Sequence, residues 1–93
     1  MLRVSDVTPR LADRVRRDFP EPGSASALIQ RLAEADEGER VQAAVVIWAM
    51  GDRARFDDSL ALCAVDWRDV LVRGGLADDD WPDRLDAELG SGS

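Results

Sequence analysis

The stretch that decides the fold is Val41-Gln42-Ala43-Ala44-Val45-Val46-Ile47-Trp48-Ala49-Met50, which contains the longest apolar run of the chain. Because Gln42 is its one polar residue, we expect a helix that is hydrophobic nearly all round and lies at the centre of the molecule, with Met50 covering part of its apolar surface. Gly51 suits the left-handed residue after the helix, and Asp52 is placed to cap the next one. This pattern predicts a tight helix–turn–helix hairpin.

Two further helices are predicted before this stretch. Thr8-Pro9 suits the start of the first, with Thr8 as the N-cap and Pro9 at the first helical position, and Pro20 ends it. Its inward stripe consists of Leu11, Val15 and Phe19.

The second helix begins at a cap supplied by Ser24 or Ser26 and runs to about residue 35. Asp36 and Glu39 then have the spacing of a capping box for the central helix, with Gly38 in its first turn. Alternatively, the second and third helices run together with a bend.

After the hairpin, the phrase D-W-x-D-x-L occurs twice, at residues 66–71 and 80–85. Each copy predicts a helix start, since an Asp can cap free backbone N–H groups and a Leu four residues after the Trp shares its face. Before the first copy, Phe56, Leu60 and Cys63 form the apolar stripe of a helix that follows Asp52. Gly74-Gly75 ends the helix begun at Asp66, and the last helix places Trp81, Leu85 and Leu89 on one face.

The predicted fold class is therefore all-α, since no strand-like alternation occurs. We expect one domain over residues 1–93, a compact bundle of five or six short helices in antiparallel hairpins. Its ordered core spans about residues 7–89, and residues 90–93 form a flexible tail.

Composition argues against an enzyme. The sequence contains neither His nor Lys, so the side chain that most readily moves protons near neutral pH and the amine of Schiff-base chemistry are both missing. Cys63, spaced with Phe56 and Leu60, is expected in the core rather than as a nucleophile. We expect no catalytic residue and no cofactor.

Charge argues against nucleic acid as a partner, because the net charge is −7 and a nucleic-acid binder presents a basic face. A small arginine cluster at positions 10, 14, 16 and 17 could meet an acidic partner, but it is rather expected to meet the acidic C-terminal part of the chain or to stay solvated. No apolar run is long enough for a membrane span, and no secretory signal is seen. With one cysteine, these features predict a cytoplasmic protein.

The aspartates of residues 78–80, with Asp83 and Asp86, suggest a metal site, since hard cations prefer carboxylates. The segment lacks the glycine and the closing glutamate of a calcium loop, so a solvated linker with a helix cap is the preferred interpretation.

A partner-binding surface is predicted from residue type, since Trp and Arg are favoured at interface hot spots. The alternative is a structural network in which Trp67 fills the core and Arg68 pairs with an acid of a neighbouring helix. Trp81, in an acidic segment at the bundle edge, is expected to be the more exposed tryptophan of the two. The candidate residues are Trp67, Arg68, Arg73 and Trp81.

One part of the chain resembles a set of short, uncharacterised bacterial helical proteins. The resemblance covers roughly residues 37–76 and rests on residues 39–45 (E-R-V-Q-A-A-V), Gly51-Asp52, Phe56 and residues 66–71 (D-W-R-D-V-L). It implies no activity. The same stretch is similar to a HEAT-type helical hairpin, but a second copy beginning near Asp66 departs from that pattern, so we expect a single HEAT-like hairpin inside a bundle.

These observations favour a non-catalytic, cytoplasmic adaptor or regulatory module that binds another protein. Two alternatives stay open. One is a structural domain that forms a homodimer through an apolar face, and the other is a carboxylate-based metal-binding protein or hydrolase.

Overall fold

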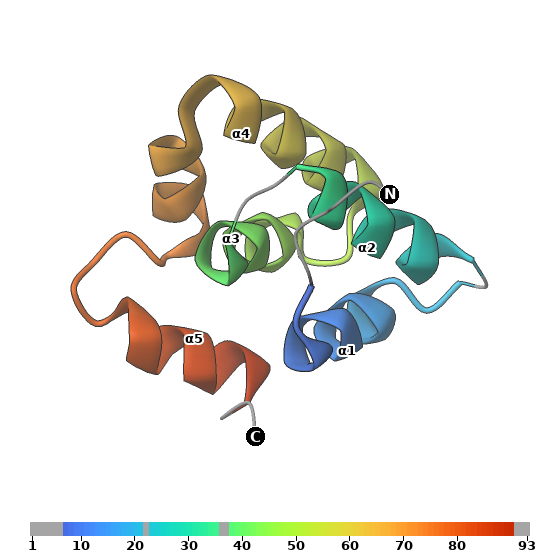
Figure 1. Ribbon diagram of the computed structural model, residues 1–93, viewed down its shortest axis with the longest axis horizontal. Coiled ribbons are helices and arrows are strands. Elements are labelled where there is room, and N and C mark those ends of the chain that lie inside the picture. The colour runs from blue at the N-terminus through green and yellow to red at the C-terminus, as the bar shows by residue number, and fades with distance from the viewer. Residues whose placement is uncertain (1–6, 22, 36–37, 91–93) are drawn as a thin grey trace, which may run out of the picture.

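The computed structural model describes residues 7–21, 23–35 and 38–90, which form five helices and contain no strand. The central helix α3 has the other four arranged around it (Figure 1). The all-α fold class is confirmed. The helices are α1 (Pro9–Asp18), α2 (Ser24–Glu34), α3 (Glu39–Ala49), α4 (Arg53–Gly74) and α5 (Trp81–Leu89).

Helix α3 supplies the centre of the core, as its composition predicts. Its residues 41–46 are all buried, and the α3–α4 contact is the most extensive between any two helices. Even Gln42 is buried, with its side-chain nitrogen donating to the Leu32 carbonyl at 3.2 Å. The expectation for Met50 is wrong. Met50 is the left-handed C-cap of α3 (φ 49°), which turns its side chain out of the core and leaves it 68% exposed.

The predicted start of α1 is confirmed, because the Thr8 hydroxyl accepts a hydrogen bond from the Leu11 amide. The predicted serine cap of α2 is wrong. Gly23 takes the N-cap position with φ 82°, a left-handed conformation that glycine adopts at little cost, and Ser24 becomes the first helical residue. The left-handed turn at position 23 thus places glycine, rather than a serine, at the start of α2.

Helices α2 and α3 are separate. Gly38 has extended backbone angles (φ −75°, ψ 170°) and is the N-cap of α3, so its predicted place in the first turn is wrong. Asp36, the predicted capping residue, lies outside the described residues. The serine-glycine tail predicted after α5 also lies outside them, except for Gly90.

Helix α4 combines the two helices predicted on either side of Asp66. The backbone of Asp66 is non-helical (φ −155°, ψ 90°), so α4 consists of segments 53–65 and 67–74 joined at a sharp bend, which lies at the upper left of Figure 1. The Asp66 carboxylate accepts from the Arg68 amide at 3.1 Å and so caps the second segment. The predicted cap of the first segment is also confirmed, since Asp52 accepts from the amides of residues 54 and 55.

Where α4 ends, it lies directly against α3. A Cβ atom placed on Gly74 would be 2.5 Å from the Ala44 Cα atom, so only a residue without a side chain permits this approach. Gly75 then takes a left-handed conformation (φ 75°), and the Leu76 amide donates to the Leu71 carbonyl. Leu76 is buried after this turn, as predicted.

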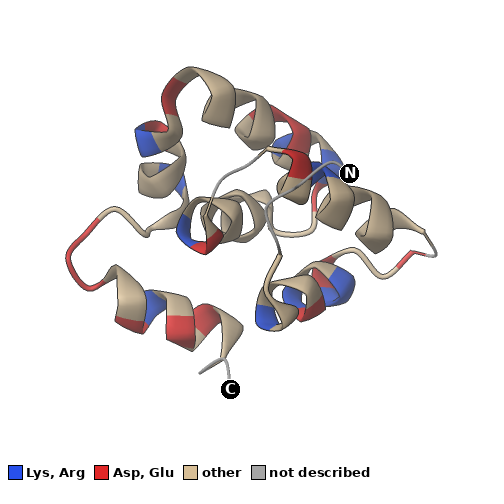
Figure 2. Cartoon of the chain, in the orientation of Figure 1, with Lys and Arg blue, Asp and Glu red and all other residues tan. Residues whose placement is uncertain are grey.

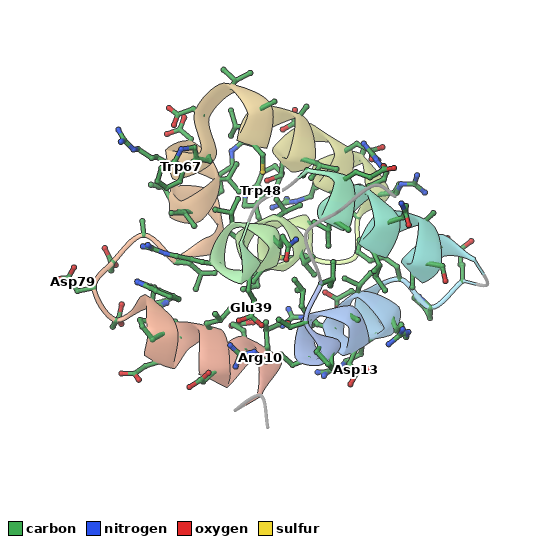
Figure 3. The ribbon with its side chains drawn as sticks, in the orientation of Figure 1. Arg10, Asp13, Glu39, Trp48, Trp67 and Asp79 are labelled. Carbon is green, nitrogen blue, oxygen red and sulfur yellow. The ribbon has the colours of Figure 1, made fainter. Side chains whose placement is uncertain are left out.

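Helix α5 is attached to the rest of the fold by its leucines and by charge. Leu85 and Leu89 are buried, as their spacing predicts. Arg10 of α1 binds Glu39 of α3 at 2.8 Å and Asp86 of α5 at 2.6 Å, and it also donates to the Gly90 carbonyl. Figure 3 shows Arg10 and Glu39 pointing toward each other.

Two of the N-terminal arginines, Arg10 and Arg14, therefore meet the chain's own acidic C-terminal part, as one of the interpretations predicts. Arg14 joins this contact by binding Glu88 at 3.1 Å. The hydrogen bonds from Arg10, followed by one from Thr8, hold the pKa of Glu39 below its usual value against the opposing effect of burial. Arg16 pairs instead with Asp13 of its own helix.

Candidate partner-binding surface

Large hydrophobic side chains are exposed at the bend of α4. Val65 is 83% exposed, Trp67 44% and Val72 66%, and these are three of the four large exposed hydrophobics among the described residues; Met50 is the fourth. Val65, Trp67 and Val72, together with Arg68, define what we call the elbow surface; Met50 is not part of it. The alternative in which Trp67 fills the core is wrong.

The bend explains why Trp67 lies outside the core. Trp67 is the first residue after Asp66, where the chain changes direction, and the second segment covers the core with Val70 and Leu71 instead. A helical pattern indicates which residues share a face, but it does not reveal the direction of a bend between two helical segments.

Arg68 connects the elbow surface along the helix. Its guanidinium lies 5.3 Å from the centre of the Trp67 ring, within the range of a cation–π contact. Val72 follows Arg68 by four residues and therefore occupies the same side of the segment. The alternative in which Arg68 pairs with an acid of a neighbouring helix is not what the structure shows, since Arg68 has no ion pair among the described residues.

Arg73 has a different environment. It binds Asp58 of the first α4 segment at 3.0 Å, and its guanidinium lies 4.5 Å from the centre of the Trp48 ring. Arg55 lies over the same half-buried ring at 4.1 Å and donates to the Trp48 carbonyl. These contacts occupy Arg73 within the fold, where it ties the two segments of α4 to each other and to α3.

Trp81 also has a place within the fold. It is partly buried against the core, and the guanidinium of Arg40 lies 4.5 Å from its ring centre. Arg40 donates in turn to the Leu76 carbonyl at 2.9 Å. The expectation that Trp81 is more exposed than Trp67 is therefore wrong. The Asp80 side chain makes no capping hydrogen bond, unlike Asp66 in the other copy of the repeated phrase.

Of the four predicted residues, Trp67 and Arg68 thus lie together on an exposed surface. Arg73 is also exposed but pairs with Asp58, and Trp81 is partly buried against the core. Sequence reasoning missed Val65 and Val72. Both fall outside the apolar stripes of their segments, and that offset was the available signal for exposure.

Exposed carboxylates accompany the elbow surface. Between residues 66 and 83, six aspartates are exposed and make no ion pair among the described residues. The acidic loop between α4 and α5 lies at the same edge of the molecule as the α4 bend (Figure 2). These aspartates are Asp66, Asp69, Asp78, Asp79, Asp80 and Asp83.

Other features of the described residues offer less. No group of three His, Cys, Asp or Glu side chains is arranged to hold a metal ion within residues 7–21, 23–35 and 38–90. Cys63 is buried, as predicted, beside a hollow of about 270 Å³ that Arg31 and Glu34 also line. Over the same ranges, no helix has the length and apolar character that a membrane crossing requires.

Comparison with protein-family models, curated proteins and solved structures found no match to this chain. The resemblance to short bacterial helical proteins and to a HEAT-type hairpin therefore stays a prediction.

Proposed function

We propose that this protein is a non-catalytic adaptor or regulatory module of the cytoplasm that binds another protein through its elbow surface. The observation that carries the proposal is the exposure of Val65, Trp67 and Val72 within eight consecutive residues of α4, at its bend and in the segment that follows. Single exposed hydrophobics are normal on a soluble protein, whereas several within one short stretch are typical of interaction sites.

The chemistry and the rigidity of the surface support the same proposal. Trp and Arg are enriched among residues that dominate binding energy, and Trp67 carries Arg68 against its ring. The segment is fixed at its start by the Asp66 cap and along its inner side by the buried Val70 and Leu71. A surface held in this way loses little conformational freedom when a partner binds.

The test is affinity capture from the native host with three baits: the wild type, the V65S/V72S variant and the M50S variant. Burial of one valine is worth about 1.5 kcal/mol, so removing two should weaken binding by about a hundredfold. Partner proteins should be recovered with the wild type and with M50S, and lost with V65S/V72S. Met50 is an exposed apolar residue away from the elbow surface and thus controls for surface hydrophobicity. Equal recovery by all three baits would remove the proposed surface.

Self-association through the same surface is the competing use of these residues, because a second copy would cover the same valines and tryptophan. The net charge of −7 opposes it, since two copies repel each other before they touch. Sedimentation over a wide concentration range distinguishes the two functions. A monomer throughout is expected for the adaptor, and a dimer abolished by V65S/V72S would establish self-association.

A further inference from the structure

Charged side chains are paired with opposite charges around α1, whereas many near the end of α4 and in the loop after it are not. The arginines of α1 are largely satisfied internally, since Arg10, Arg14 and Arg16 all have carboxylate partners. Over residues 66–83 the situation is reversed, because six exposed aspartates make no ion pair there. The stretch has two arginines: Arg73 is occupied by Asp58, and Arg68 alone has no ion pair among the described residues, so negative charge exceeds positive. The uncompensated negative charge of the described residues is therefore concentrated beside the elbow surface.

The carboxylates and the exposed hydrophobics belong to one continuous region. Asp69 precedes Val72 by three residues and therefore neighbours it on the helical segment. The loop of residues 75–80 leaves the end of that segment. Figure 3 shows Trp67 and Asp79 toward the same edge of the molecule. A ligand that covers the valines of the elbow surface must then approach a strongly acidic margin.

This combination selects the kind of partner. A protein segment that carries both positive charges and apolar side chains would bury the hydrophobic residues and meet the unpaired aspartates at their rim, the arrangement that gives interfaces their orientation and fast association. Nucleic acid and anionic lipid carry the same sign of charge as this region and are repelled. A second copy of the chain brings the same carboxylates and is repelled for the same reason.

We propose that the elbow surface binds a basic segment of a partner protein, whose apolar side chains contact Val65, Trp67 and Val72 while its Arg or Lys side chains meet Asp69 and the aspartates of the α4–α5 loop. This inference rests on the proposed function, since it names the chemistry of the partner at that surface. The Arg68 guanidinium already lies over the Trp67 ring, so the positive side chains of the partner are expected at the aspartates rather than on that face of the ring.

The experiment uses the full-length chain in its native host, with the photo-reactive residue benzoylphenylalanine in place of Val72 or, as a control, in place of Met50. Irradiation joins position 72 to whatever covers it, and mass spectrometry identifies the joined segment. The position-72 protein is also made with D69N/D79N and with the matched pair E21Q/E34Q, which removes the same charge from exposed positions elsewhere. Thermal unfolding confirms that each variant is folded.

The expected result is a cross-link from position 72, and not from position 50, to a segment rich in Arg or Lys. The D69N/D79N change should lower its yield by about threefold, the scale of two exposed ion pairs, and E21Q/E34Q should leave it unchanged. A neutral or acidic segment, or equal effects of the two double variants, would overturn the basic partner and leave the proposed function intact. A cross-link to a second copy would also overturn it. No cross-link to any protein would remove both proposals together.

Discussion

The close approach of α4 to α3 at Gly74 gives the sharpest prediction on stability, and the perturbation is G74A. A methyl group at Gly74 would lie 2.5 Å from the Cα, 2.6 Å from the Cβ and 2.8 Å from the carbonyl oxygen of Ala44. Two of these three atoms belong to the backbone of α3, which cannot turn aside as the end of a flexible side chain can. Helices α3 and α4 must therefore separate, and they form the largest helix–helix contact of the fold.

The magnitude follows from two opposing contributions. Overpacking of a well-packed interior costs about 1–3 kcal/mol, and a clash with backbone belongs at the upper end. Replacement of a helical glycine by alanine returns about 1 kcal/mol through helix propensity. The net loss is about 2 kcal/mol, which for a domain of this size lowers the thermal midpoint by about 8–16 °C.

Thermal and urea unfolding followed by far-ultraviolet circular dichroism measure this loss. The control is G38A, because Gly38 has an ordinary φ of −75° and a Cβ atom there meets nothing within 4 Å. G38A should lower the midpoint less than G74A does, since its cost is that of alanine for glycine at an N-cap. In the A44G background the further loss caused by G74A should be smaller than in the wild type, since A44G removes the Cβ–Cβ clash but keeps the backbone contacts. A G74A protein as stable as the wild type would refute the described approach of α3 and α4.

Three further comparisons between variants test other parts of the fold. D66A should lower the free energy of unfolding by about 1 kcal/mol through loss of an N-cap, whereas D80A, which removes no capping bond, should have little effect in the same urea titration. E39Q tests the ion pair of α3 with α1. Hydrogen bonds from the α1 guanidinium lower the pKa of Glu39 in the folded chain, so the carboxylate stabilises the fold fully at pH values above its ordinary pKa of about 4.3. The difference in unfolding free energy between wild type and E39Q should therefore shrink as the pH falls through the lower pKa of the folded chain. W81A should lower the thermal midpoint more than W67A, since Trp81 is packed against the core and Trp67 is exposed; equal shifts would contradict these environments.

Local signals made much of this fold predictable. The caps at Thr8, Asp52 and Asp66 depend on neighbours within three residues, and all three are found. The apolar run that builds α3 is likewise visible in the sequence, because a helix without a polar face must be central. The closing turn at Gly75 follows from its glycine and the apolar residue after it.

The candidate site was less predictable, because it depends on how segments are oriented. Residue type singled out Trp67 and Arg68, which are exposed and in contact with each other, but the bend that exposes Trp67 has no signature beyond the Asp66 cap. Trp81 occurs in an acidic segment that suggests exposure, yet Arg40, forty-one residues earlier, lies against its ring. Contacts over such separations in sequence are set by the tertiary fold rather than by local composition.

The most direct test of the account is hydrogen exchange of the full chain, free and in complex with the partner recovered by wild-type capture. If the partner binds at the elbow surface, exchange in the complex should be slower for the backbone amides of residues 65–73 and for the indole N–H of Trp67. Exchange in α1 and α2, which lie on other sides of α3, should be unchanged (Figure 1). Protection confined to α1 or α2, with residues 65–73 exchanging as in the free protein, would contradict the central claim that this protein binds its partner at the bend of α4.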